Sequence, residues 1–409
     1  MSFRFSLTTA LFFIIFQVYG QQPHVNILAS DTLYGRGYAS GGMDKAALYI
    51  ADRFTEYGVE VLPGMSSYLQ EFTHPVNVFP GDLSLTPADG AELMPGRDYL
   101  VHPASPSVSG VYDLVYRLGR APGQQEMIVI EDTFASDKSY IRMMQELESY
   151  TASAESPGAG AIMLTDRKLT WHVSIQQVAK PLFIIKKDRW KENTWKLRVE
   201  VEAVFEPGFI ASNVAGMICG ENTDSVVLIG AHYDHLGLMG QNTVFPGAND
   251  NASGMAMLLE LAEHFSRNKP PVNMVFVAFG SEEAGLIGSR YFTDKPPLDL
   301  SRIKLMLNLD LNGTGEDGIT VVNGKVLPGV FEKLTELNDE DDLLPAIKAR
   351  GEAYNSDHCP FYDRGVPAVF IYTLGGIQAY HDIYDKAETL PLTEFTDLKE
   401  LLIRYITSP

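Results

Sequence analysis

The stretch VVLIGAHYDHLG, residues 226–237, decides the fold, because an apolar run typical of a buried strand ends in histidine and acidic side chains. Two further stretches, NMVFVAFGSEEAGLIGS (273–289) and KLMLNLDLNG (304–313), likewise place acidic residues after an apolar run. Amphipathic patterns at helical spacing follow such strands, for example at 254–265 and 329–338. This alternation predicts an α/β fold with a mixed, centrally parallel sheet flanked by helices on both faces.

Polar side chains stand where these strands are expected to end, and ligands of open α/β sheets bind beyond the carboxyl ends of the strands. His232 has the residue type of a metal ligand, and the Asp234 carboxylate, two residues on, can reach back to its second ring nitrogen. Alone, this His-x-Asp pattern is also compatible with a surface coincidence. Asp250, in the glycine-rich PGANDNASG, is alone also compatible with a helix cap.

Two further acidic positions follow strongly apolar segments. Glu282 and Glu283 are adjacent carboxylates at a strand end, where they repel each other unless a cation or a shared proton is present. The alternative for this pair is a favourable charge at a helix N-terminus. Asp310 lies within an apolar run, where an unpaired carboxylate is costly, and a buried ion pair is the alternative. His381 stands in a loop before the last expected helix and gains its meaning from the others.

Together these positions form one set of imidazoles and carboxylates without a thiolate: His232, Asp250, Glu283, Asp310 and His381. Such a set suits zinc, and also manganese or cobalt. Five ligands exceed the need of one tetrahedral zinc, so two Zn²⁺ ions (or Mn²⁺ or Co²⁺) that share a bridging carboxylate fit better. Glu282 is then free of metal and is the natural general base for a water molecule.

The order of these segments resembles that in metallopeptidase family 28. The segments GAHYDH, PGANDNASG, FVAFGSEEAGLIGS, NLD and YHDIYD carry the resemblance, which covers roughly residue 212 onward. The stretch SDTLYGRGYASGGMDKAALYIADRF (30–54) is similar to an N-terminal part of the same family. The resemblance implies the zinc-exopeptidase fold and a peptide substrate.

The resemblance also implies a role for each site residue. Asp250 would bridge both metals, with Glu283 and His381 completing one site and His232 and Asp310 the other. Glu282 would be the general base, and Asp234 the acid behind His232. Candidates for substrate contact are Tyr354 or Tyr380 near the oxyanion, and Asp357 and His358 in YNSDHCPF (354–361), which resembles the Ser-Asp-His turn of the family. A satisfied loop network is the alternative for that turn.

The chain divides into four expected parts. Residues 1–20 read as a secretory signal peptide, with Arg4 before an apolar run, so we expect an exported protein in the periplasm or outside the cell. Residues 21–76 and 207–409 are expected to form the peptidase domain. Residues 77–206, a run of short alternating strands with one helix, are similar to the protease-associated domain that several family members carry as an insertion.

We therefore expect an exported metallo-exopeptidase, and an aminopeptidase in particular. A carboxypeptidase of the glutamate-carboxypeptidase kind is an alternative, because Arg350 and Arg364 are near the expected cleft and such an enzyme needs basic side chains. Two further alternatives are a glutaminyl cyclase, expected to bind one zinc, and a receptor-like binding protein without metal. Side-chain preference stays open.

Composition excludes other classes of function. The formal net charge of −20 repels phosphate backbones, so we expect no nucleic-acid partner. No stretch after the apolar leader reaches about 18 apolar residues, so we expect no stable membrane insertion. The only two cysteines, Cys219 and Cys359, cannot form a disulfide framework, and thiolate catalysis at Cys359 is disfavoured. The sequence leaves the oligomeric state open.

Overall fold

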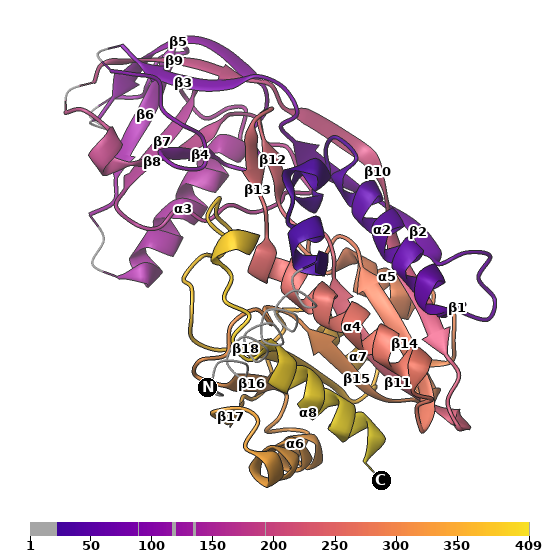
Figure 1. The fold of residues 1–409 in the computed structure, drawn as a ribbon. Helices are drawn as coiled ribbons and strands as arrows, with labels where there is room; N and C mark the ends of the chain where they lie inside the picture. Colours follow the sequence, from indigo (N-terminus) through magenta and orange to yellow (C-terminus); the bar gives the residue numbers. More distant parts are fainter. Residues whose placement is uncertain (1–22, 89, 117–119, 134–135, 193, 409) are drawn as a thin grey trace, which may run out of the picture.

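The computed structural model describes residues 23–88, 90–116, 120–133, 136–192 and 194–408. The expected signal peptide, residues 1–20, lies outside these described residues. Two large sheets make up the molecule, and Figure 1 shows the smaller one as a separate unit above the larger one. Among the described residues, no helix has both the length and the apolar character that a bilayer span takes.

The larger sheet has nine strands in the order β1-β10-β14-β11-β15-β18-β16-β17, with β2 paired to β10. Its strands are β1 (Glu60–Val61), β2 (Leu69–Val78), β10 (Val204–Ile218), β11 (Asn222–His232), β14 (Val272–Phe279), β15 (Ile303–Leu309), β16 (Ile319–Val322), β17 (Ile347–Ala349) and β18 (Ala368–Thr373). The central strands β14, β11, β15 and β18 run parallel. At one side β10 pairs antiparallel with β14, and at the other β16 pairs antiparallel with β18. The expected mixed, centrally parallel sheet is confirmed.

Helices cover both faces of this sheet, as expected. They are α2 (Gly42–Tyr57), α4 (Gly254–Arg267), α5 (Ile287–Asp294), α6 (Pro328–Asp341), α7 (His358–Tyr362) and α8 (Phe395–Thr407), with short helical turns η1 (Asp31–Arg36), η3 (Ala248–Ser253), η4 (Leu300–Arg302) and η5 (Ala387–Thr389). Because side chains of a strand alternate between faces, Phe276 of β14 belongs to the buried cluster that contains residues of α2, α4 and α8. Its neighbour Val277 belongs to the cluster on the other face, with Phe292 of α5 and Phe361 of α7.

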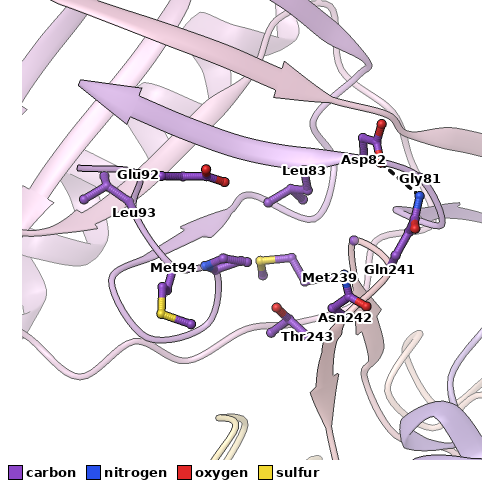
Figure 2. A pocket seen from close by; sticks show the side chains of 12 residues that line it. Gly81, Asp82, Leu83, Glu92, Leu93, Met94, Met239, Gln241, Asn242 and Thr243 are labelled. Carbon is purple, nitrogen blue, oxygen red and sulfur yellow. Dashed lines mark hydrogen bonds between the residues drawn. The ribbon is translucent and has the colours of Figure 1, made fainter. Parts of the chain in front are cut away.

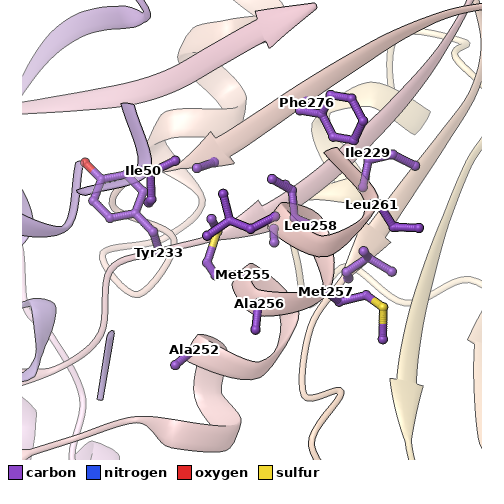
Figure 3. Close-up of a cluster of buried hydrophobic side chains, with 14 of the residues drawn as sticks. Ile50, Ile229, Tyr233, Ala252, Met255, Ala256, Met257, Leu258, Leu261 and Phe276 are labelled. Atoms are coloured by element: carbon purple, nitrogen blue, oxygen red, sulfur yellow. The ribbon is translucent and has the colours of Figure 1, made fainter. Parts of the chain in front are cut away.

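The core between α4 and the sheet is built from aliphatic and aromatic side chains. Figure 3 shows Leu258 and Leu261 of α4 in the same buried cluster as Ile229 of β11 and Phe276 of β14. The central strands are apolar on both faces because helices lie on both, which is why they read as continuous apolar runs in the sequence.

The smaller sheet has seven strands in the order β3-β9-β5-β6-β7-β8-β4. The strands are β3 (Leu83–Pro87), β4 (Tyr99–Val101), β5 (Val108–Val115), β6 (Glu126–Glu131), β7 (Gly160–Thr165), β8 (Leu182–Lys186) and β9 (Lys196–Val201), with α3 (Asp137–Ala152) and η2 (Lys187–Arg189) between them. This unit has its own hydrophobic cluster. The chain enters it after β2 and leaves it before β10, so it is an insertion between two paired strands of the larger sheet.

A short hairpin of the larger unit, β12 (Gly237–Met239) and β13 (Thr243–Phe245), joins the two units. Met239 and Phe245 are buried in the cluster of the smaller unit. Where the turn of this hairpin meets the segment before β3, a pocket of about 480 Å³ is lined by Leu83, Met239 and their neighbours (Figure 2). Gln241 crosses this junction and donates to Asp82 Oδ1 at 2.9 Å. The smaller unit is therefore packed onto the larger one.

Replacing Leu258 by alanine tests the core beneath α4. Leu258 is 0% exposed, and its truncation leaves a cavity, so we expect a loss of about 2–5 kcal/mol in the free energy of unfolding. Leu48→Ala in α2, where the side chain is 57% exposed, is the matched control and is expected to change stability by less than about 0.5 kcal/mol. Urea unfolding measures both, and equal midpoints for the two variants would contradict this account of the core.

Candidate metal centre

The parallel strands bring their carboxyl ends to one edge of the larger sheet. His232 is the last residue of β11 and pairs in register with Phe279, the last residue of β14. Asp310 directly follows β15, and Glu282 and Glu283 follow β14 after a two-residue turn. Since the ends of neighbouring parallel strands lie side by side, these side chains meet at one place.

Asp250 lies between two histidines and uses one oxygen for each. His232 Nε2 is 3.3 Å from Asp250 Oδ1, and His381 Nε2 is 3.1 Å from Asp250 Oδ2. His232 Nε2 also lies 3.4 Å from Asp310 Oδ1, and His381 Nε2 lies 3.3 Å from Glu283 Oε2. The structure thus brings together all five residues that the sequence analysis selected as metal ligands, in two groups that share Asp250.

The chemistry of these groups fits divalent cations. Their side chains are buried, and Asp310 Oδ1 has no hydrogen-bond partner although it is inaccessible to water. His232, Asp250 and Asp310 offer one nitrogen and two carboxylate oxygens within 4.8 Å of one another. Nitrogen and oxygen donors in this combination suit zinc. One ion would be held by His232, Asp250 and Asp310, and a second by His381, Asp250 and Glu283.

His235 is a third imidazole at the centre. Its Nδ1 lies 2.8 Å from Glu283 Oε1, and its buried Nε2 has no partner. With Asp250 and Glu283 it forms another group of donors within 4.8 Å. His235 stands in GAHYDH, three residues after the expected ligand His232, and it is not among the sequence-based candidates.

Glu282 is half-buried beside the ligands. Its pKa is raised well above the ordinary value, first by burial and then by the carboxylates of Asp357, Glu283 and Asp310, against the opposing effect of His232. A carboxyl group in such a position exchanges protons more readily near neutral pH than an exposed one does. The general-base role of Glu282 stays a prediction.

Asp234 acts differently from what the sequence suggested. We expected its carboxylate to hold the second ring nitrogen of His232, but the Asp234 carbonyl oxygen is 3.1 Å from that Nδ1 and the carboxylate oxygen 4.0 Å. The carboxylate instead accepts the backbone N–H groups of Glu282 at 3.0 Å and Glu283 at 3.2 Å. Tyr38 donates its hydroxyl to the same carboxylate at 2.5 Å. Asp234 is thus a positioning residue that orients the backbone of both glutamates.

Arg36 holds together the backbone segments around the centre, and the sequence did not indicate this role. Its buried guanidinium donates five hydrogen bonds to backbone carbonyl groups, those of Leu28, Tyr233, Pro246, Gly247 and Asp250. An arginine in the glycine-flanked segment GRG gave no periodic signal. It ties the N-terminal segment to the strand end of β11 and to the turn that carries Asp250.

Two more contacts fix ligands from behind. Asp385 accepts the backbone N–H groups of Asn249 at 2.8 Å and Asp250 at 3.0 Å, and burial raises its pKa to about 6. Ser356 donates to Asp310 Oδ2 at 2.8 Å. Outer contacts of this kind orient metal ligands and are part of a metal site.

The four candidates for substrate contact separate in the structure. Tyr380 stacks on His381 with ring centroids 4.0 Å apart, and the acids of the centre raise its pKa after burial does. Asp357 is buried near Glu282, and burial raises its pKa to about 7. Tyr354 is 61% exposed and has Asp363 and Glu352 rather than metal ligands as its acidic neighbours.

The expectation for His358 is wrong. The side chain is 1% exposed and packs against Phe370 with ring centroids 5.6 Å apart, so a bound peptide cannot reach it. Burial lowers its pKa to about 4, which leaves the ring neutral in the core. The Ser-Asp-His turn therefore contributes Ser356 and Asp357 to the centre, and His358 to packing.

Residues 213–406 match the model of peptidase family M28. The match contains every residue of the two metal-binding groups. These residues therefore form a peptidase family M28 domain. The smaller sheet precedes the matched residues, so its likeness to a protease-associated domain stays a prediction.

Curated relatives carry names of the same kind. The chain is 28% identical over 304 residues to aminopeptidase YwaD of Bacillus subtilis, a match that covers 68% of this chain and 62% of the relative. It is 37% identical over 161 residues to an aminopeptidase of Pseudomonas aeruginosa, covering 36% of this chain and 28% of that protein. The chain thus spans less than two thirds of the length of these relatives.

Solved structures share the whole fold. A zinc aminopeptidase from Bacillus subtilis superposes with a TM-score of 0.68 at 20% identity, covering 94% of this chain and 93% of the other. A peptidase M28 precursor from Shewanella amazonensis gives a TM-score of 0.67 at 16% identity, covering 95% and 96%. At these identities the comparison establishes the fold, including the smaller unit within the aligned length.

Replacing Arg36 by lysine tests its structural role. A lysine has three donors on one nitrogen and cannot serve five carbonyl groups, so buried acceptors stay unpaired and we expect about 3–5 kcal/mol of lost stability. Arg142→Lys on α3, where the side chain is 82% exposed, is the control with no expected change. Both are measured by urea unfolding, and wild-type stability in Arg36→Lys would disprove the role.

Proposed function

We propose that the protein is an exported metallo-exopeptidase of the aminopeptidase class, which hydrolyses N-terminal residues from peptides with two zinc ions and Glu282 as general base. The observation that carries the proposal is the placing of Asp250 between two histidine–carboxylate groups, with the half-buried carboxyl group of Glu282 beside them. The family M28 domain and relatives named as aminopeptidases support the aminopeptidase class. The proposal of export rests on the leader-like residues 1–20.

Zinc at these residues supplies Lewis-acid chemistry, which polarises a carbonyl oxygen and lowers the pKa of water. The protein's own part in the reaction is proton transfer. Glu282 accepts the proton of the attacking water and delivers it to the nitrogen of the leaving amine, so the group ends each cycle as it began. Burial favours the protonated state that Glu282 holds between the two transfers.

Positioning of this base comes from the turn after β14. Asp234 accepts the N–H groups of Glu282 and Glu283, so the base and a metal ligand are held by one carboxylate. Tyr380, stacked on His381, lies where a donor could meet a substrate oxygen, and we propose it rather than Tyr354 for that contact. Tyr380 is preferred because the acids of the centre are its neighbours, whereas the acidic neighbours of Tyr354 are Asp363 and Glu352.

The carboxypeptidase alternative loses one of its supports. Arg364 forms an ion pair with Asp294 and donates to the carbonyl group of Pro360 at 3.0 Å, so its guanidinium is already engaged. A glutaminyl cyclase would need one zinc, whereas two groups of ligands are present. Metal stoichiometry and the end of the peptide that is cleaved therefore discriminate among these enzymes.

Glu282→Gln is expected to lower kcat by about 10²–10⁴-fold while metal content stays at the wild-type level, because the amide cannot accept the proton. Glu340→Gln, at an exposed position of α6, serves as the control. Steady-state kinetics and elemental analysis on the same preparations check both. Full activity of Glu282→Gln with bound metal removes the base assignment.

Elemental analysis of the wild-type protein is expected to find about two zinc ions per chain. Asp310→Ala should keep about one, because only His232 and Asp250 remain at its site, whereas Asp250→Ala should weaken both sites since both share Asp250. A wild-type protein with one ion would favour the cyclase, and one with none the receptor-like protein.

The cleaved end of the peptide is tested with two substrates. We expect hydrolysis of aminoacyl p-nitroanilides and no release of the C-terminal residue from N-blocked dipeptides. The reverse pattern would make the enzyme a carboxypeptidase. Loss of hydrolysis after chelation, and its return with zinc, is the accompanying control.

A further inference from the structure

The segment Lys168–His172 belongs to the inserted unit, in the connection between β7 and β8, yet it contacts the loop that carries His381. We call it the bridging segment. More than 200 residues separate it from His381 in the sequence, since the hydrogen bond between Trp171 and His381 spans 210 positions. Through this segment the inserted unit reaches the metal centre.

The backbone of Trp171 brackets His381 on two sides. The N–H group of Trp171 donates to the carbonyl oxygen of His381 at 2.9 Å, and the Trp171 carbonyl oxygen lies 2.9 Å from His381 Nδ1. Nε2 of the same ring faces Asp250 and Glu283. A proton on Nδ1, donated to Trp171, leaves the lone pair of Nε2 for a metal ion. A carbonyl oxygen can only accept, so the contact with Trp171 favours the ligating tautomer of His381, and His172 Nδ1 of the same segment lies 3.2 Å from His381 Nδ1.

Lys168 fixes the loop around His381. Its ammonium group donates to the carbonyl oxygens of Gln378 at 2.6 Å and Tyr380 at 3.1 Å, and pairs with Asp382 Oδ2 at 2.8 Å. An ammonium group has three donors, so all of them serve this loop. Asp382, the neighbour of the ligand, is 4% exposed, and without Lys168, whose side chain is 43% exposed, this buried carboxylate would lose its cationic partner.

The backbone of His381 needs such support. Its φ angle is 52°, in the left-handed region that a residue with a side chain seldom adopts. Residues persist there only when the surrounding contacts determine the conformation. Trp171 contacts His381 itself, and Lys168 contacts the residues on either side of it, Tyr380 and Asp382.

The bridging segment is itself anchored. Trp171 is buried, donates its indole N–H to the carbonyl oxygen of Val101 at 2.8 Å, and packs its ring on Phe245 with centroids 4.8 Å apart. Val101 is in β4 of the inserted unit, and Phe245 is in β13 of the larger one. The segment therefore has a fixed position relative to both units.

We propose that the bridging segment is a positioning element for the metal ligand His381, and that the inserted unit is thereby a working part of the metal centre. The proposal rests on the proposed function in so far as His381 holds zinc. It assigns Lys168 and Trp171, which the family match does not include, a role in zinc affinity.

Lys168→Met in the full-length protein tests the proposal, because it keeps the length of the side chain and removes all three donors. Lys138→Met, at an exposed position of α3 in the same unit, is the matched control. Zinc retention is measured by elemental analysis after dialysis against graded concentrations of a chelator. We expect one of the two zinc ions to bind about 10–100-fold more weakly in Lys168→Met, and no change in Lys138→Met.

Activity gives a second readout. With zinc in large excess, kcat of Lys168→Met should return toward the wild-type value, because the defect is one of affinity. A merely structural role for Lys168 would lower thermal stability without moving zinc retention, and that result overturns the proposal. Lys168→Arg should restore much of the affinity, since a guanidinium group can serve the same acceptors.

Asp382→Asn provides an independent variant of nearly the same shape, which carries the test if Lys168→Met does not fold. The double variant Lys168→Met/Asp382→Asn should lose less zinc affinity than the product of the two single losses, because both remove one ion pair. Unchanged zinc retention in Asp382→Asn would count against the proposal. If the wild-type protein binds no zinc, the proposed function fails; if it binds two and the variants equal the control, only this inference fails.

Discussion

The crowding of carboxylates at the carboxyl end of three parallel strands is the constraint on which the rest of the structure depends. Burying a carboxylate costs several kcal/mol unless charge or hydrogen bonds compensate, and here several lie within one small volume. The acids are Asp234, Asp250, Glu282, Glu283, Asp310, Asp357 and Asp385. They outnumber the imidazoles that face them, so a buried excess of negative charge prepares the place for cations.

The chain compensates these acids in two ways that have different consequences. Asp234 and Asp385 are satisfied by backbone N–H groups, so they become fixed supports that hold Glu282, Glu283 and Asp250 in place. The carboxylates of Asp250, Glu283 and Asp310 face imidazoles and stay available for a metal. Arg36, whose charge is also buried, contacts carbonyl oxygens and holds the turn before α4 from outside.

Much of the centre could be predicted from the sequence because its signals are local. A strand that is buried on both faces is apolar throughout, so a polar residue at its end stands out, as His232, Glu283 and Asp310 do. The topology then brings such ends together without any further information. The fold class followed from the same alternation of strands and helices.

Other features could not be predicted, because spacing does not tell which atom of a residue makes a contact. Asp234 stands two residues from His232, but its carbonyl oxygen makes the contact and its carboxylate turns to the next strand end. His358 has the type of a site residue, yet packing against Phe370 decides its place. Arg36 and Trp171 act on partners about 200 residues away, and no local pattern encodes such distances.

The contacts of Arg36 and of His381 also bear on how the protein is made. Arg36 lies near one end of the described chain and His381 near the other, and both are needed at one centre. A nascent chain that ends just after β18, at Thr373, has all the strands of the larger sheet but lacks His381. The proposed metal centre therefore cannot be completed during translation until the loop that carries His381 has left the ribosome.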